Sequence, residues 1–344
     1  MIKRTIEISR RPAHLSAKLG QLIVQPFDAP KDEATSIPAE DIGIVVVDHA
    51  QVIYSHGALQ TLLDNGACVV ICGRDHQPAG LLLPVSPHTQ QVERLRIQID
   101  ASKPTNKRLW QQVVIAKVRA QASNLLRPTE GRPEGAEISR RKLANLAGEV
   151  KSGDTSNVEA QAAKVYWAAW RQFGGPELHG WYRDKDGTDP LNAHLNYGYA
   201  ILRAAVARAL VAAGLHPALG LHHQNRANAF CLADDLMEPF RPLIDREAIA
   251  LIREGREQLD QSNKARLLAL LTAECVMDDQ SGPLMVQLHR MTASLVRCLS
   301  GEDRQLAIPK ARVLESTGEE PGQTHVSREE KNANTADFPS GGGG

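Results

Sequence analysis

Short apolar runs recur through the first 88 residues and predict a β-rich segment. The runs Ile42–Val47 and Cys68–Cys72 are almost wholly apolar and are bordered by Gly or Asp, which is typical of buried strands. Weaker strand patterns cover residues 5–8, 51–54 and 80–85. Residues 56–65 have helical spacing, and the glycine that follows them is expected to end that helix.

After Pro87 the apolar positions change to the three-and-four spacing of helices. Residues 192–213 are strongly apolar and predict a buried central helix, and residues 106–126 predict a long helix that ends before Pro128. Further helices are predicted at residues 89–99, 140–150, 158–173, 233–238, 245–257, 264–274 and 282–300. Beyond Glu315 the chain is polar, which predicts a disordered tail.

These elements predict an α+β fold of two domains. A small β-rich N-terminal domain is expected at residues 1–88, a larger all-α C-terminal domain at residues 89–314, and the disordered tail at residues 315–344. No Gly-x-Gly-x-x-Gly follows a predicted strand, so a dinucleotide-binding fold is not indicated.

Composition places the chain among globular proteins, with 42% hydrophobic and 23% charged residues. The five cysteines include no Cys-x-x-Cys pair, which argues against a structural zinc knuckle, and free thiols favour a reducing cytoplasm. Charges interrupt the apolar runs near the N-terminus, so no signal peptide is expected. No stretch approaches the roughly 18 apolar residues of a membrane span.

Positive charge is concentrated in one part of a neutral chain. Residues 94–171 contain fifteen Lys or Arg and seven Asp or Glu, an excess of eight positive charges. A local basic zone can hold phosphates even where the whole protein has no net charge. The alternative is that these side chains only solvate helix faces.

Candidate metal ligands cluster in the second half of the chain. His222 and His223 precede a short predicted helix that carries Asp235 and Glu238, three residues apart and therefore on one helix face. An imidazole with carboxylates is a ligand set that divalent ions accept. Adjacent histidines in extended chain point to opposite sides, so one of the two is expected to serve the site. The alternative is an ordinary helix start, whose acids favour the helix dipole.

Glu159 is a candidate metal ligand, but its position also fits a structural role at the start of a helix. It stands three residues after Ser156 at the start of a predicted helix, which is the pattern of a capping box. The competing interpretation is metal ligation by the same carboxylate. Trp167 and Trp170 on this helix are expected in the core, whereas Tyr182 lies in a polar loop suited to an exposed aromatic contact.

Three segments together resemble the integrase–nuclease subunit of CRISPR spacer acquisition, in its type II form. They are Asn157-Val158-Glu159-Ala160 to Trp167, Asp189-Pro190-Leu191-Asn192 to Leu202, and Gly214-Leu215-His216-Pro217 to Asp245. Their order and the β-then-α layout match over roughly residues 1–310. The combination is far more specific than any single piece.

The resemblance implies a site and a reaction. Glu159, His223 and Glu238 would be the catalytic residues and the ligands of Mg²⁺ or Mn²⁺, with Asp235 as a nearby acid of the same site. His223 is preferred to His222 because the family's ligand directly precedes a variable loop. The implied reaction inserts short foreign DNA duplexes, called spacers, into a CRISPR array, by attack of a DNA 3′-OH on a phosphodiester. A nuclease mode would use water instead.

The resemblance also implies partners. The β-rich domain would serve dimerisation and partner contacts, and the helical domain would bind the metal and double-stranded DNA. The chain would form a homodimer, and a small dimeric CRISPR adaptation protein would join two such dimers into a heterohexamer in a prokaryotic cytoplasm. Two other functions stay open on the residues alone: a non-catalytic helical DNA-binding scaffold, and a small-molecule metallohydrolase with an enclosed pocket.

Overall fold

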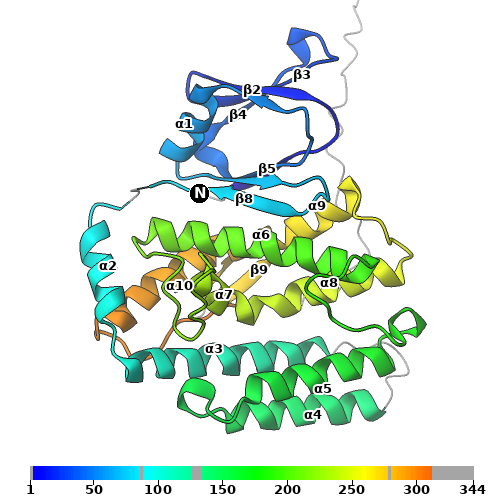
Figure 1. The fold of residues 1–344 in the computed structure, drawn as a ribbon, viewed down its shortest axis with the longest axis vertical. Coiled ribbons are helices and arrows are strands. Elements are labelled where there is room, and N and C mark those ends of the chain that lie inside the picture. The colour runs from blue at the N-terminus through cyan, green and yellow to red at the C-terminus, as the bar shows by residue number, and fades with distance from the viewer. Residues whose placement is uncertain (1–2, 86–87, 126–133, 278–279, 312–344) are drawn as a thin grey trace, which may run out of the picture. The chain divides into compact units, whose positions relative to one another are not determined.

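The N-terminal strands form two four-stranded sheets with one short helix, α1 (His56–Asp64), packed against them (Figure 1). The computed structural model describes residues 3–85, 88–125, 134–277 and 280–311. The first sheet has the order β1 (Arg4–Ile8), β5 (Ile42–Val47), β7 (Cys68–Cys72), β8 (Pro78–Leu82), and only β8 is antiparallel to its neighbour. The second has the order β4 (Thr35–Pro38), β3 (Gln21–Pro26), β2 (Ala13–Lys18), β6 (Ile53–Tyr54).

The strand β5 is buried on both faces and connects two cores. Val45 and Val47 pack into the core between the two sheets and α1. Ile44 and Val46, which point the other way, belong to the core of the helices. The apolar runs predicted as buried strands therefore are buried strands. One hydrophobic core contains residues from both sides of residue 88. The division into domains at that residue stays a prediction.

The helices follow the strands in the order expected. Their bounds are α2 (Gln91–Asp100), α3 (Lys103–Asn124), α4 (Glu134–Glu149), α5 (Val158–Phe173), α6 (Pro190–Ala212), α7 (Cys231–Met237), α8 (Arg241–Arg253), α9 (Gln261–Ala269) and α10 (Leu284–Leu299). The α+β fold class, with a β-rich N-terminal and a helical C-terminal part, is confirmed.

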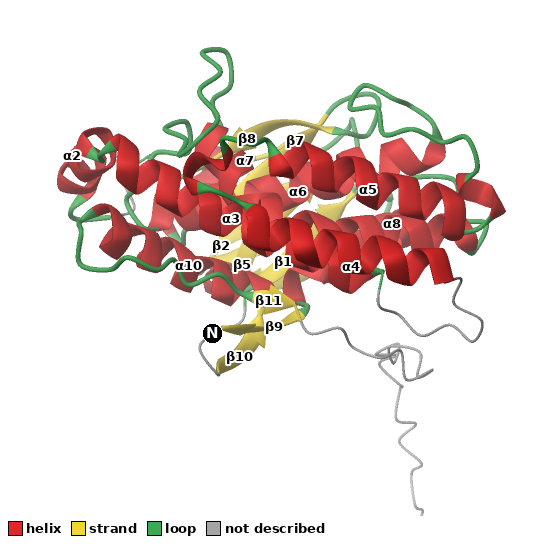
Figure 2. Ribbon diagram, turned by 90° about the horizontal axis from the view of Figure 1, so that it is seen from below, coloured by secondary structure: helices red, strands yellow, loops and turns green. Residues whose placement is uncertain are grey.

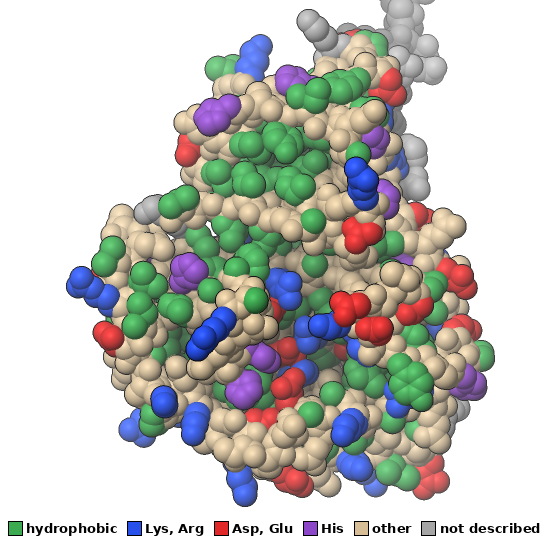
Figure 3. Space-filling model, in the orientation of Figure 1, with side chains coloured by type: hydrophobic (Ala, Val, Ile, Leu, Met, Phe, Trp, Pro, Cys, Tyr) green, Lys and Arg blue, Asp and Glu red, His purple; other side chains and the backbone are tan. Residues whose placement is uncertain are grey.

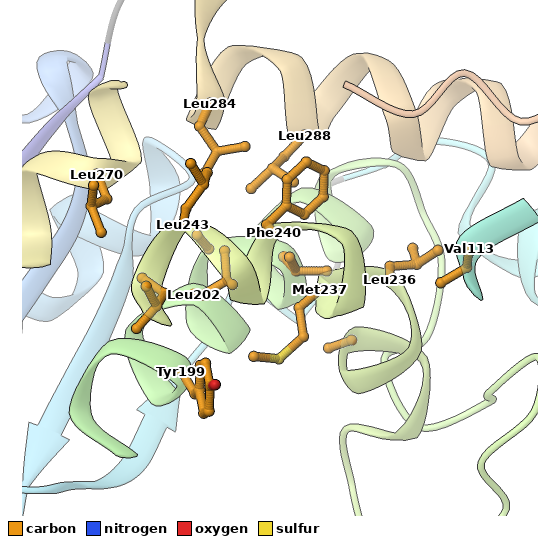
Figure 4. Close-up of a cluster of buried hydrophobic side chains, with 14 of the residues drawn as sticks. Val113, Tyr199, Leu202, Leu236, Met237, Phe240, Leu243, Leu270, Leu284 and Leu288 are labelled. Carbon is orange, nitrogen blue, oxygen red and sulfur yellow. The ribbon is translucent and has the colours of Figure 1, made fainter. Parts of the chain in front are cut away.

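The helix α6 is the centre of the helical part, as its apolar sequence predicted. It packs against β7 and β8 on one side and against α7, α8, α9 and α10 on the others (Figure 1). Asp189 caps its first turn and Pro190 is its first residue, both favourable at a helix start. Phe240 and Met237 enter the same buried cluster as Leu202 and Leu288 (Figure 4). The backbone on either side of Glu238 is therefore anchored in the core.

The helical part is not wholly α-helical. A three-stranded antiparallel sheet, β10 (Gln280–Pro283), β9 (Glu274–Met277), β11 (Lys310–Ala311), lies beside α10 (Figure 2). The helix predicted at residues 264–274 is wrong at its end, because α9 stops at Ala269 and Glu274 begins β9. Pro128 and the predicted tail lie outside the described residues. Within the described part, no helix is long and apolar enough to cross a membrane.

Candidate active site

One ammonium group joins two glutamates that are far apart in the chain. Lys117 lies in α3, Glu159 in the first turn of α5, and Glu238 begins the 3₁₀ turn η5 (Glu238–Phe240) after α7. Lys117 Nζ lies 2.6 Å from Glu159 Oε1 and 2.5 Å from Glu238 Oε2. Burial lowers the pKa of Lys117, but the two carboxylates outweigh burial and raise that pKa, so the ammonium is charged. Because α3 packs against both α5 and η5, helix packing sets this arrangement.

A left-handed turn directs Glu159 into this cluster. Asp154 and Asn157, just before α5, have φ angles of 48° and 53°, a region that non-glycine residues rarely adopt. The Asp154 carboxylate accepts hydrogen bonds from Val158 N at 2.8 Å and Glu159 N at 3.0 Å. The capping box predicted for Ser156 and Glu159 is therefore wrong. Asp154 caps the helix, which leaves the Glu159 carboxylate for other contacts.

Glu238 lies between two cations and is only 3% exposed. Arg241 Nη1 lies 2.9 Å from its Oε1, and Lys117 contacts its other oxygen. Burial raises the pKa of Glu238, but the charges of Arg241 and Lys117 outweigh burial and hold that pKa below its ordinary value. Glu238 also keeps helical dihedrals directly before Pro239, a position where the helical region is usually disfavoured.

A buried carboxylate orients His223. Asp235, with no exposed surface, accepts a contact of 2.5 Å at its Oδ1 from His223 Nδ1. The same carboxylate accepts the backbone N–H groups of His222 at 2.9 Å and His223 at 3.3 Å. The hydrogen bond to Asp235 raises the pKa of His223, and the charges of Glu238 and Glu159 add to this effect. With Nδ1 bound to Asp235, Nε2 is the ring atom of His223 that remains for a ligand.

His222 has a different role from His223. Its ring stacks on Trp110, with centroids 4.5 Å apart and planes 3° apart, while His223 meets the same indole edge-on at 5.5 Å. The expectation that the two rings point to opposite sides is therefore wrong, because both lie against Trp110. The Asp234 carboxylate is also occupied by other side chains, since it binds Arg203 at 2.6 Å and Asn228 at 2.7 Å.

Sequence reasoning missed several residues of this cluster. Lys117 stands among buried apolar residues of α3, so its position in a buried run was the available signal. Asp245 is a second such residue, because it is 2% exposed and accepts a hydrogen bond from Tyr199. Burial raises the pKa of Asp245 to about 6, and the hydrogen bond from Tyr199 opposes that rise.

A family model described as CRISPR associated protein Cas1 matches residues 6–279 of the chain. The chain belongs to the Cas1 family. Among curated Cas1 proteins, a relative from Neisseria meningitidis, named CRISPR-associated endonuclease Cas1, is 33% identical over 299 residues. That match covers 86% of this chain and 92% of the relative.

Solved structures share the fold at low sequence identity. A casposase bound to its integration product has a TM-score of 0.70 at 16% identity and covers 88% of this chain and 92% of its own. A Cas1 chain from a partial Cas6-RT-Cas1–Cas2 complex has a TM-score of 0.60 at 21% identity, with coverage of 88% and 97%. At these identities the likeness concerns the fold alone, and it agrees with the Cas1 assignment.

The donor atoms fit the divalent ion that the Cas1 resemblance implies. Two carboxylates and one imidazole nitrogen are a set that Mg²⁺ and Mn²⁺ accept. A carboxylate that binds the other ring nitrogen, as Asp235 does for His223, is common at metal-bound histidines. Within the described ranges, no three acidic, histidine or cysteine side chains stand in ready coordination geometry. The Lys117 ammonium contacts both glutamates.

Histidine, acidic and basic side chains gather in a hollow on one face of the helical part (Figure 3). A cavity of about 430 Å³ adjoins His223 and is lined also by Gln98, Asn106 and Asn225. Several basic side chains of residues 94–171 are exposed, namely Arg96, Lys103, Lys107, Arg119, Arg141, Lys142, Lys151 and Lys164. Arg127 and Arg132 of that zone lie outside the described residues.

Proposed function

We propose that this chain is a metal-dependent DNA endonuclease and integrase that joins short duplexes to a CRISPR array. One observation carries the proposal: in a chain of the Cas1 family, Glu159 and Glu238 share one buried ammonium. His223 lies within the electrostatic reach of both carboxylates. The name of the N. meningitidis relative and the casposase likeness support the same chemistry.

Each side chain has a distinct role in this proposal. Glu159, Glu238 and Nε2 of His223 would hold Mg²⁺ or Mn²⁺. When bound, the ion would polarise a phosphoryl oxygen and stabilise charge that develops during attack by a DNA 3′-OH or water. Asp235 keeps the proton of His223 on Nδ1, and Arg241 holds one oxygen of Glu238.

The basic side chains of residues 94–171 would bind the DNA backbone without reading its sequence. The exposed members of this set within the described residues lie on helices α2 to α5 and, for Lys151, just after α4, so they would contact a duplex at several phosphates rather than at one point. A homodimer, and a heterohexamer with a small dimeric adaptation protein, would supply the rest of the DNA surface. The Cas1–Cas2 assembly named for one neighbour of the same fold supports this partner.

Half-site integration of a short duplex into a repeat-containing plasmid tests the proposal. The wild type should join the duplex in Mg²⁺ or Mn²⁺ and fail in chelator, with and without the small partner compared side by side. Glu159→Gln, His223→Ala and Glu238→Gln should each abolish joining, while Glu149→Gln, an exposed glutamate at the end of α4, should keep it. Joining that survives in chelator, or in any of the three site variants, refutes the mechanism. Duplex binding with no joining by the wild type would instead support the scaffold function.

A further inference from the structure

Lys117 is an unusual lysine, because its ammonium lies in the protein interior against two carboxylates. Its side chain is 7% exposed and that of Glu238 is 4% exposed, whereas the side chain of its other partner, Glu159, is 25% exposed. The only feature of comparable burial among the ion pairs described is Lys264 with Asp48, at 4% and 3% exposed, which joins α9 to the end of β5. That second pair has a single carboxylate and lies outside the candidate active site.

The two glutamates and the two cations that bind them carry equal and opposite charge, and the buried acids Asp235 and Asp245 lie close to the same groups. Glu159 and Glu238 contribute two negative charges, and Lys117 and Arg241 contribute two positive ones. A divalent ion on the same carboxylates would add two positive charges close to those of Lys117 and Arg241 in a partly buried site, which is unfavourable in a medium of low dielectric. Phosphates are the anions that would remove this excess. Charge balance therefore favours entry of the ion together with DNA.

The ammonium and the ion would also require the same atoms. Lys117 Nζ contacts Glu159 Oε1 and Glu238 Oε2, so one oxygen of each glutamate is occupied by the same ammonium. An ion that binds both glutamates displaces the ammonium from at least one of them. Lys117 has a flexible four-carbon side chain and three donors, so a phosphate oxygen can replace the lost carboxylate as its partner.

We propose that Lys117 couples metal binding to DNA binding: its ammonium competes with the divalent ion for Glu159 and Glu238 until a DNA phosphate takes that ammonium. This inference rests on the proposed function. It makes Lys117 a positioning residue, and it makes the ion-binding site complete only with DNA present. By thermodynamic linkage, the factor by which DNA tightens ion binding equals the factor by which the ion tightens DNA binding.

The test measures Mn²⁺ affinity by electron paramagnetic resonance of the free ion, using the full-length chain with and without a short duplex whose 3′ ends are dideoxy-blocked. Glu238→Gln, measured in parallel, gives the background from the duplex itself. For the wild type we expect the duplex to tighten Mn²⁺ binding by at least about tenfold. Lys117→Met should bind Mn²⁺ without DNA about tenfold to a hundredfold more tightly than the wild type, since no charged hydrogen bond is displaced.

Lys264→Met is the matched control. It removes the other buried lysine and should leave the Mn²⁺ affinity unchanged, so a general effect of losing a buried ammonium is separated from competition at the site. If Lys117→Met does not fold, the wild-type comparison still decides. Equal Mn²⁺ affinity with and without the duplex overturns the coupling, as does a Lys117→Met affinity no tighter than that of the wild type.

Failure of the function is distinguishable from failure of the inference. If neither the wild type nor Lys117→Met binds Mn²⁺ above the Glu238→Gln background, with or without duplex, the proposed metal site is overturned and the coupling with it. If the wild type binds Mn²⁺ above that background but equally with and without DNA, the metal site stands and only the role of Lys117 is refuted.

Discussion

Asp235→Asn tests whether the orientation of the His223 ring matters, because it changes the carboxylate that orients the ring and leaves His223 itself in place. The Asp235 carboxylate has two contacts on Oδ1, from His223 N and Nδ1, and one on Oδ2, from His222 N. An asparagine has one acceptor oxygen and one donor nitrogen. If its oxygen keeps His223, its NH₂ group faces the N–H of His222, which is donor against donor. In the reverse orientation, the asparagine loses its hydrogen bond with the His223 ring.

The magnitude follows from that count. One backbone donor without a partner beside a fully buried side chain costs about 2 kcal/mol in the free energy of unfolding. Loss of a carboxylate that orients a metal-binding histidine typically weakens the metal site about tenfold to a hundredfold. We therefore expect Asp235→Asn to lower the urea midpoint and to need about tenfold more Mn²⁺ for half-maximal joining.

The assays are urea unfolding and half-site integration across a Mn²⁺ titration, with duplex present throughout. Asp234→Asn is the control, because it is the neighbouring acid on α7 but binds Arg203 and Asn228 instead of a histidine. It should leave the Mn²⁺ requirement within about twofold of the wild type, as expected for a residue that contacts neither the ion nor one of its ligands. The reasoning is refuted if Asp235→Asn changes neither the stability nor the Mn²⁺ requirement, or if Asp234→Asn changes the Mn²⁺ requirement equally.

Three further outcomes are expected. Because the hydrogen bond to Asp235 raises the pKa of His223, joining should decline as the pH falls through that raised pKa, where protonation removes the Nε2 lone pair. The His223–Asp235 pair has the opposite pH dependence in folding. Its contribution to the free energy of unfolding is present below the ordinary histidine pKa and is lost as the pH rises through the raised pKa. Urea unfolding between about pH 5 and pH 8 would measure this loss. Trp110→Ala, at a side chain 1% exposed that stacks on His222, should cost about 4 kcal/mol, while Trp110→Phe should keep most of the stability. Asp154→Ala, which leaves two N–H groups of α5 without their cap, should cost about 2 kcal/mol by urea unfolding and reduce joining.

Local patterns in the sequence predicted the elements well. The helix at residues 158–173 has the predicted bounds, and the apolar runs became β5 and β7. The hairpin of β2 and β3 was not predicted individually. Its turn residues Leu19 and Gly20 have φ angles of 51° and 74°, and a leucine gives little sign of such a turn.

The site was predictable only as far as neighbours in sequence determine it. Asp235 and His223 lie twelve residues apart, and their spacing was informative. Lys117 meets Glu159 and Glu238 only through the packing of α3 on α5 and η5, which no spacing in one sequence reveals. The capping box at Ser156 failed for a related reason, because the left-handed turn at Asp154 and Asn157 supplies a cap that lies outside the usual pattern.

The two-sided burial of β5 limits how the chain can be divided. A fragment that ends at residue 88 would present Ile44, Val46, Cys68 and Val70 to water as one apolar sheet face. Exposed faces of this kind promote aggregation. Truncation experiments that aim to isolate the strands should therefore carry α6 along, because α6 covers β7 and β8. Whether an N-terminal fragment of this chain stays soluble should therefore depend on which helix is kept with it, and not on where the strands end.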